Sequence, residues 1–378
     1  MNILTTKITD KKRSIFLYSL LFTLFIASFL FVQFNYGLYE RTIAKVTSVS
    51  VEESSENVDM YDNKDILTTQ HLVAKVMNGD YKGQEIHIEN EFSFSGAYDQ
   101  EYKVGNELFV MIDQTADAQS DLSATIQDVK RDKYLLIVAW AFIFTLLFVG
   151  KKQGLFSIIS LVVNAVLLSY ALDLYLQSSG IHLLVICSIS IILFTVISLL
   201  LVNGLNEKTY AAIIATLLGT FSSLLITYAV MWVTNEQGLR YEEIQFITRP
   251  YKLVFLAGLF IGSLGAVMDV AITMSSSIFG LYEKDHNISN KALKKSGMEI
   301  GKDIMGTMTN ILFFAYISGS IPMLILYFKN ASPLGFTLSM NLSLELARAL
   351  AGGIGIVVTI PIGLYVTMLF VNRKRAKL

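Results

Sequence analysis

The sequence predicts a polytopic α-helical membrane protein with about eight transmembrane helices and a small extracytoplasmic β-rich domain between helices 1 and 2. Hydrophobic residues make up 53% of the 378 positions and charged residues 16%, against about 25% charged in soluble domains. The apolar residues fall into blocks, each long enough to cross a hydrocarbon core of about 30 Å. The charge is also divided, because residues 38–133 hold 19 acidic and 9 basic residues whereas the rest is net positive. Together these observations exclude an ordinary soluble domain.

The first apolar run follows a basic segment. Lys7, Lys11, Lys12 and Arg13 precede an apolar stretch from 14 to 33. A cleaved signal peptide would have a shorter apolar core followed by small residues, whereas the segment here continues with large and polar side chains. We therefore expect residues 1–37 to form a cytoplasmic N-terminus and an uncleaved signal-anchor helix.

Seven further apolar blocks lie in residues 134–378, at about 134–150, 154–175, 181–202, 210–233, 253–274, 304–328 and 350–371. Lysine and arginine gather in the cytoplasmic segments of membrane proteins. With the N-terminus inside, the predicted cytoplasmic segments hold 16 basic residues and the short outer segments hold 5. The sequence therefore predicts a seven-helix domain that ends with a cytoplasmic C-terminus.

Residues 38–133 form the predicted extracytoplasmic domain. Stretches near 43–51, 72–77, 84–91 and 107–113 have strand character, and Asn78-Gly79 opens a hairpin signal between the second and third. We expect 52–65 to be a mobile acidic loop and 114–127 a polar return to the membrane. The single cysteine, Cys187, lies in an apolar block, so this domain has no disulfide.

The block at 253–274 carries a carboxylate in an apolar environment. Steps of three or four residues join it to glycines and hydroxyls on one helical face, namely Gly258, Gly262, Gly265, Asp269, Thr273 and Ser276. A charge at a helix centre costs about 3 kcal/mol on insertion scales, so it needs a partner or a wet cavity. The glycines are predicted to let another helix approach closely.

A second polar stripe begins the block at 304–328. It contains Asp303, Thr307 and Asn310, with Gly306 predicted to thin the helix for packing. The two stripes could together bind a cation or carry a proton, or they could hydrogen-bond to each other and hold two helices together. Between the two blocks, lysines at 291, 294 and 295 suit either a short helix at the inner membrane surface or a solvated loop.

The sequence has no sign of covalent catalysis or of a cofactor. The four histidines offer no metal-ligand spacing, and no nucleophile-elbow or P-loop motif is present. We therefore expect a protein that is not an enzyme, has no cofactor and has no nucleic-acid partner. Which metal ion, if any, the carboxylates bind is left open.

Two motifs resemble those of the YibE/F family of bacterial multipass membrane proteins. They are Gly265-Ala-Val-Met-Asp-Val-Ala271 and the longer run from Ser296 to Asn310, which includes Gly-Lys-Asp-Ile-Met-Gly-Thr-Met-Thr-Asn. The likeness spans about residues 133–371 and includes both aspartates. It implies a bacterial plasma-membrane protein with a second family member as a partner, and it implies no particular activity.

Two classes of function fit these features. The first is a transporter or channel component for a small solute or ion, with Asp269 and Asp303 in a polar intramembrane site. The second is a receptor or assembly subunit that holds a partner through its outer domain without transporting anything. In either case we expect a multi-pass protein of the bacterial plasma membrane, in contact with lipid, that assembles with a related chain or with itself.

Overall fold

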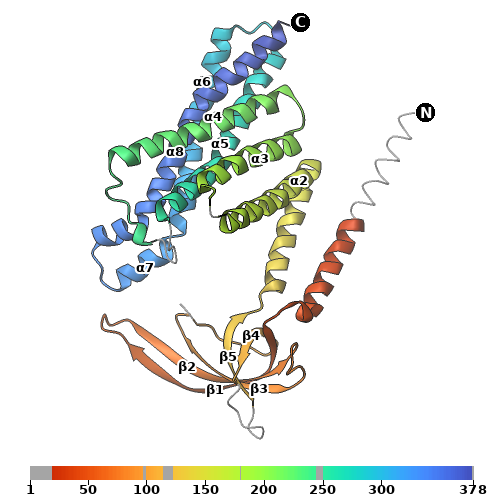
Figure 1. Ribbon diagram of the computed structural model, residues 1–378, viewed down its shortest axis with the longest axis vertical. Coiled ribbons are helices and arrows are strands. Elements are labelled where there is room, and N and C mark those ends of the chain that lie inside the picture. Colours follow the sequence, from red (N-terminus) through yellow and green to blue (C-terminus); the bar gives the residue numbers. More distant parts are fainter. Residues whose placement is uncertain (1–18, 97–98, 114–121, 179, 244–249, 377–378) are drawn as a thin grey trace, which may run out of the picture. The chain divides into compact units, whose positions relative to one another are not determined.

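The structure is a computed structural model that describes residues 19–96, 99–113, 122–178, 180–243 and 250–376. The chain divides into two compact units, residues 1–145 and 146–378. The first unit contains a β domain and two apolar helical segments, and the second is a helical bundle (Figure 1).

The first helix of the described chain runs from Ser19 and ends in a 3₁₀ turn, η1 (Asn35–Leu38). Most of its apolar side chains are exposed, as a helix surrounded by lipid requires. It packs against the first part of α2 (Asp132–Gln177) through Phe25, whose ring lies 5.3 Å from that of Trp140. The Trp140 indole N–H also donates to the Ser28 hydroxyl at 2.9 Å. These contacts hold the two segments together.

The β domain is a closed five-stranded barrel in the order β1-β2-β3-β5-β4. Its strands are β1 (Thr42–Val58), β2 (Lys64–Val76), β3 (Glu85–Ser93), β4 (Glu107–Ile112) and β5 (Leu122–Val129). All neighbours are antiparallel except β3 and β5. Alternate residues of the strands point inward and, with Tyr102 from the connection between β3 and β4, form a core of Ala44, Val46, Leu72, Ala74, Val76, Ile86, Ile88, Leu108, Val110 and Ala124.

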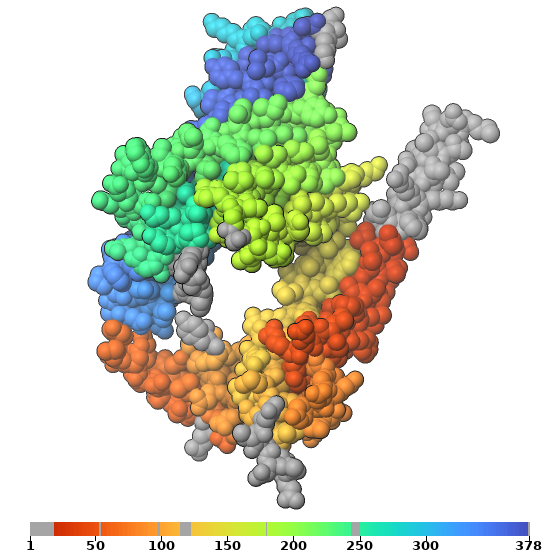
Figure 2. Space-filling model, in the orientation of Figure 1, coloured from red at the N-terminus to blue at the C-terminus, as the bar shows by residue number. Residues whose placement is uncertain are grey.

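The barrel corrects two predictions about its polar segments. The stretch 52–65, predicted as a mobile loop, contains the last residues of β1, the turn after it and the first residues of β2, and this ribbon is paired from Ser54–Thr68 to Val58–Lys64. This ribbon extends beyond the barrel (Figure 1) and its tip lies on the molecular surface in Figure 2. The end of the predicted polar return, from Leu122, is the fifth strand, and residues 114–121 lie outside the described chain. Side chains add to the backbone ladder in both segments, because Lys64 pairs with Glu56 and the Ser54 and Thr68 hydroxyls are hydrogen-bonded in the ribbon, while Ala124 of β5 packs into the barrel core.

The second unit packs its helices around α5 (Tyr251–Lys284), which contacts α3 (Leu183–Asn203), α4 (Glu207–Val233), α6 (Asn290–Ser318) and α8 (Leu334–Arg375). Small residues bring these helices close together. A Cβ atom on Gly355 of α8 would lie 2.9 Å from Val267 of α5 and 3.2 Å from the Ser223 hydroxyl of α4. The close approach explains why α4, α5 and α8 form the densest part of the bundle.

Six described helices are long and apolar enough to cross a membrane, and α6 with the short α7 (Ile321–Lys329) makes a seventh if this pair, bent by 51°, counts as one span. The predicted block 304–328 is therefore broken, because Pro322 begins a new helix after the turn at Gly319. The predicted blocks 134–150 and 154–175 are joined in α2. That helix breaks at Lys151, whose φ is 49°.

The break in α2 is a sharp turn of the chain. A Cβ atom on Gly154 would collide with the carbonyl oxygen of Leu146, which a continuous helix would hold about 12 Å away along its axis. Glycine is therefore required at position 154 for the two limbs to meet.

The connection between α5 and α6 is shorter than predicted. The structure has neither a separate surface helix nor a long loop there, because α5 continues to Lys284 and α6 begins at Asn290. Ser289 caps α6 by accepting the Ala292 N–H at 3.1 Å. The lysines at 291, 294 and 295 therefore belong to the first turns of α6.

Candidate functional site

The stripe predicted on one face of the 253–274 block lies on the open side of α5. Gly258, Gly262, Gly265, Asp269 and Ser276 are exposed and Thr273 is half-buried. The other faces of this helix carry fifteen buried residues that pack against its neighbours. The six stripe residues therefore share the one side of α5 that the bundle leaves open.

The glycines on this side differ in what they contact. A Cβ atom on Gly262 would collide with the hydroxyl of Tyr316 on α6, so this glycine permits a close helix contact as predicted. Atoms added at Gly258, Gly265 or Gly306 would meet nothing within 4 Å. No helix that the structure describes packs closely at these three positions, so the predicted close packing there would require a second chain.

The stripe predicted after residue 303 lies on the exposed side of α6. Asp303, Gly306, Thr307 and Asn310 are all exposed. The opposite side packs on α8, where Gly301 contacts Ile360 and Leu312 contacts Gly352. The Thr307 hydroxyl donates to the Ile304 carbonyl of its own helix at 2.9 Å, so its oxygen can still accept a hydrogen bond or bind a cation.

The two stripes lie at the same level of adjacent antiparallel helices. Gly262 lies beside Tyr316, and further along α5 Ile278 lies 3.4 Å from a Cβ atom placed on Gly297. A step of one residue toward the C-terminus of α5 therefore corresponds to a step of about one residue toward the N-terminus of α6. Asp269 consequently lies near the level of Thr309, and Asp303 near the level of Thr273. The stretches 269–276 and 303–310 therefore lie side by side, although they belong to two different helices.

Neither carboxylate has a partner among the residues that the structure describes. Asp269 and Asp303 make no hydrogen bond or ion pair with any described residue. The described chain also has no group of three or more His, Cys, Asp or Glu side chains that could hold a metal ion. The stripes offer carboxylate, hydroxyl and amide oxygens, the ligand types of hard cations. A cation bound here would complete its ligand set with water or with oxygens from another chain.

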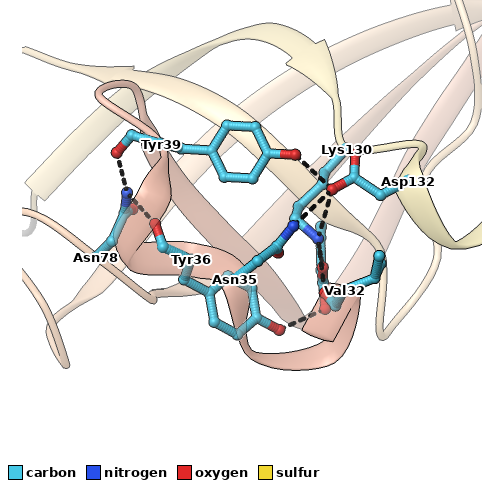
Figure 3. A network of polar contacts seen from close by, with 8 residues as sticks. Val32, Asn35, Tyr36, Tyr39, Asn78, Lys130 and Asp132 are labelled. Carbon is cyan, nitrogen blue, oxygen red and sulfur yellow. Dashed lines mark hydrogen bonds and ion pairs between the residues drawn. The ribbon is translucent and has the colours of Figure 1, made fainter. Parts of the chain in front are cut away.

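A second polar centre, which the sequence did not reveal, lies in the first unit. The Lys130 ammonium is surrounded by the end of the first helix, strand β4 and the start of α2 (Figure 3). It lies 3.3 Å from the carboxylates of both Glu107 and Asp132, and it donates to the Val32 carbonyl at 3.2 Å. Its side chain is 1% exposed. The two carboxylates and the carbonyl offset the cost of burying this ammonium group.

Two tyrosines complete this centre. Tyr36 donates to Glu107 at 2.6 Å and Tyr39 donates to Asp132, and Lys130 lies over both rings. The hydrogen bond to Asp132, followed by burial and the negative charge of Asp132, raises the pKa of Tyr39 above its usual value. Each carboxylate thus receives both a hydrogen bond and a cation.

Asn78 fixes the same turn from the barrel side. Its side-chain amide donates to the carbonyls of Tyr36 and Tyr39 at 3.0 and 3.1 Å (Figure 3). It also donates to the Arg41 carbonyl at 3.0 Å, and its oxygen accepts the Ile43 N–H at 2.6 Å. The sequence signal was a hairpin beginning at this residue. The burial of Asn78 against a turn 40 residues earlier in the chain had no sequence signal.

Comparisons with known proteins agree with these two units. No curated protein and no solved structure matches the chain. A family model described as YibE/F-like protein matches residues 138–373, and one described as YibE/F family N-terminal domain matches residues 37–129. The two models together cover nearly the whole chain, and the chain therefore belongs to the YibE/F family.

Proposed function

We propose that this protein is a subunit of a transporter or channel for a small ion or solute, with Asp269 and Asp303 in its polar intramembrane site. One observation supports the proposal: two polar stripes lie at the same level on the exposed sides of α5 and α6, and neither carboxylate has a partner in the described part of the chain. A lipid-facing carboxylate deep in an apolar helix costs several kcal/mol. Water in a pathway or oxygens of a second chain would remove this cost.

The proposal includes eight membrane crossings in a bacterial plasma membrane, with both termini in the cytoplasm and the β domain outside. Counting the two limbs of α2 separately and the α6–α7 pair as one span adds two crossings to the six apolar helices. In this topology Lys151 and Lys152, at the turn of α2, lie on the cytoplasmic side. Most of the other lysines and arginines in the short segments between spans lie on that side too.

A second chain is part of the proposal, either another copy or a related YibE/F member. Gly258, Gly265 and Gly306 have open space beside them. Glycine stripes of this kind let a partner backbone approach closely in the membrane. Such a partner would cover the open side of α5 and bring its own polar groups to the two carboxylates. We assign the protein no enzymatic activity and no cofactor.

The experiment is flux through reconstituted vesicles, with Asp269→Asn and Asp303→Asn compared with the wild type. Asparagine keeps the size of the side chain but can neither hold a negative charge nor carry a proton. We expect flux to be lost while the melting temperature changes as little as it does for substitutions of exposed residues, because neither aspartate contacts a partner in the described ranges. Asp285→Asn, in the exposed turn between α5 and α6, is the matched control and should retain flux.

Two results would count against transport. Equal flux in the wild type and both variants would remove the carboxylates from the pathway. A loss of flux in proportion to a loss of thermal stability would show that the aspartates hold helices together.

A receptor or assembly subunit is the second candidate function. It is favoured by the β1–β2 ribbon, whose tip exposes Met60 and Tyr61 (88% and 49% exposed). Exposed apolar residues beyond a folded core are typical of a contact surface. Changing both to serine should abolish function under this alternative and leave it unchanged if the protein only transports.

A further inference from the structure

A cavity of about 510 Å3 lies in the first unit, where the end of the first apolar helix meets the barrel. Its walls come from the last turn of that helix, from strand β1 and from the turn between β2 and β3. They include Gln33, Phe34, Gly37, Lys45, Asn78 and Lys82. The cavity is independent of the polar stripes and of the transport proposal.

The walls of this cavity are held in place by the protein itself. Asn78 binds three carbonyls of residues 36–41 and the backbone N–H of Ile43. The turn that carries Lys82 is closed by the Gly83 N–H, which donates to the Val76 carbonyl at 2.9 Å. Gly83 has a φ of 92°, a conformation that glycine adopts without strain. The cavity is therefore formed before any ligand arrives.

The cavity is basic within an acidic domain. Lys45 and Lys82 are its charged lining residues, and no carboxylate lines it. Neither lysine side chain makes an ion pair or hydrogen bond with any described residue. Glu107, which is opposite Lys45 across the β1–β4 ladder, is already bonded to Tyr36 and Lys130. The side chains of Lys45 and Lys82 therefore line one cavity, and neither has a carboxylate partner among the described residues.

The cavity also lies at the end of a membrane-spanning segment. Phe34 and Leu38, in the last turns of the apolar helix, are 74% and 70% exposed. This position corresponds to the headgroup level of a bilayer. Basic pockets at this level bind anionic headgroups. A ligand here would meet positive charge inside the cavity and apolar surface at its mouth.

We propose that this cavity binds the phosphate group of an anionic phospholipid. Lys45 and Lys82 contact the phosphate, the Gln33 side chain offers a further donor, and the acyl chains lie along Phe34 and the first helix. The bound lipid would join the β domain to the membrane surface, beside the Lys130 centre that joins it to the helices.

The test uses the full chain in nanodiscs that contain phosphatidylglycerol at a low fraction in phosphatidylcholine, with bound lipid counted by native mass spectrometry. In the Lys45→Gln/Lys82→Gln variant we expect about thirtyfold weaker retention of phosphatidylglycerol, since one lysine near a headgroup contributes about fivefold. The control is Lys64→Gln/Lys103→Gln. It removes the same charge from the same domain at lysines that are 72% and 73% exposed and paired with glutamates.

A third variant keeps both lysines and fills the space. An atom added at Gly37 meets nothing within 4 Å, so Gly37→Leu should fold, as its melting temperature would show, and should reduce lipid retention. Equal losses in the lysine variant and its control, or full retention in Gly37→Leu, would overturn the proposal. Displacement of the lipid by millimolar inorganic phosphate would identify free phosphate as the ligand and exclude the lipid.

Discussion

Lys130 and Glu107 form a buried ion pair, with 3.3 Å between the lysine Nζ and a carboxylate oxygen and side chains 1% and 8% exposed. Glu107 begins strand β4, and Lys130 lies between the end of β5 and the start of α2. The same ammonium group binds the Val32 carbonyl of the first helix. This pair therefore connects the barrel to both apolar segments of the first unit.

Lys130→Met should destabilise the first unit by about 3–5 kcal/mol, because the buried Glu107 and the half-buried Asp132 would be left without a cation. Protease resistance of the β domain in the purified full chain would measure the loss. The control is Lys103→Met, which removes a pair with Glu101 whose side chains are 73% and 49% exposed. Exposed pairs contribute about 1 kcal/mol or less. Similar losses in both variants would show that the burial of Lys130 has no energetic consequence.

The Tyr39 hydroxyl should make the first unit sensitive to alkaline pH. Its hydrogen bond to Asp132, its burial and the charge of Asp132 raise its pKa in the folded state. The neutral form is therefore favoured by folding, and this stabilisation is complete below the ordinary tyrosine pKa of about 10. It is lost as the pH rises through the higher folded value.

Melting temperatures measured between pH 8 and pH 12 would test this expectation. The wild type should lose stability above pH 10 more steeply than Tyr39→Phe, which should melt lower at pH 8 because it has lost the hydrogen bond. Tyr61→Phe, at the exposed ribbon tip, is the control. Parallel pH profiles for the wild type and Tyr39→Phe would contradict the prediction.

Leucine substitutions at Gly265 and Gly352 should differ in their effect on the stability of the helical unit. A side chain at Gly352 would lie 2.7 Å from Leu312, so Gly352→Leu should cost about 1–3 kcal/mol through overpacking. A side chain at Gly265 meets open space, so Gly265→Leu should leave the single chain stable. If a second chain packs there, this variant should be smaller than the wild-type complex in mild-detergent size analysis. An unchanged size would place the partner elsewhere.

Cysteine labelling would test the proposed topology. The single native cysteine, Cys187, is buried and can be replaced by serine. In that background, Met60→Cys at the ribbon tip should react with a membrane-impermeant maleimide on intact cells. Ala376→Cys, exposed at the end of α8, should react only after permeabilisation. The reverse pattern would invert the orientation inferred from the basic residues.

The sequence alone determined the class of this protein, the location of the β domain and the two polar stripes. These features depend on local properties. The length of an apolar run determines whether a helix can cross a membrane, and helical periodicity places Asp269 on the same face as Gly265 and Gly262. The family motifs between Gly265 and Asn310 were also readable without a structure, since they are continuous in the chain.

The tertiary structure alone decided the features that depend on distant residues. Strand β5 closes the barrel between β3 and β4, and its short alternation of Leu122, Ala124 and Ile126 has a core to pack into only in the folded barrel. Lys130 appears in sequence as one charge in a charged segment, and only folding brings Val32 and Glu107 to it. The predicted stripes could equally have faced each other inside the bundle. The burial of the other faces of α5 against its neighbours, and of the opposite face of α6 against α8, instead leaves Asp269 and Asp303 exposed, because one side of each helix remains for a partner or for water.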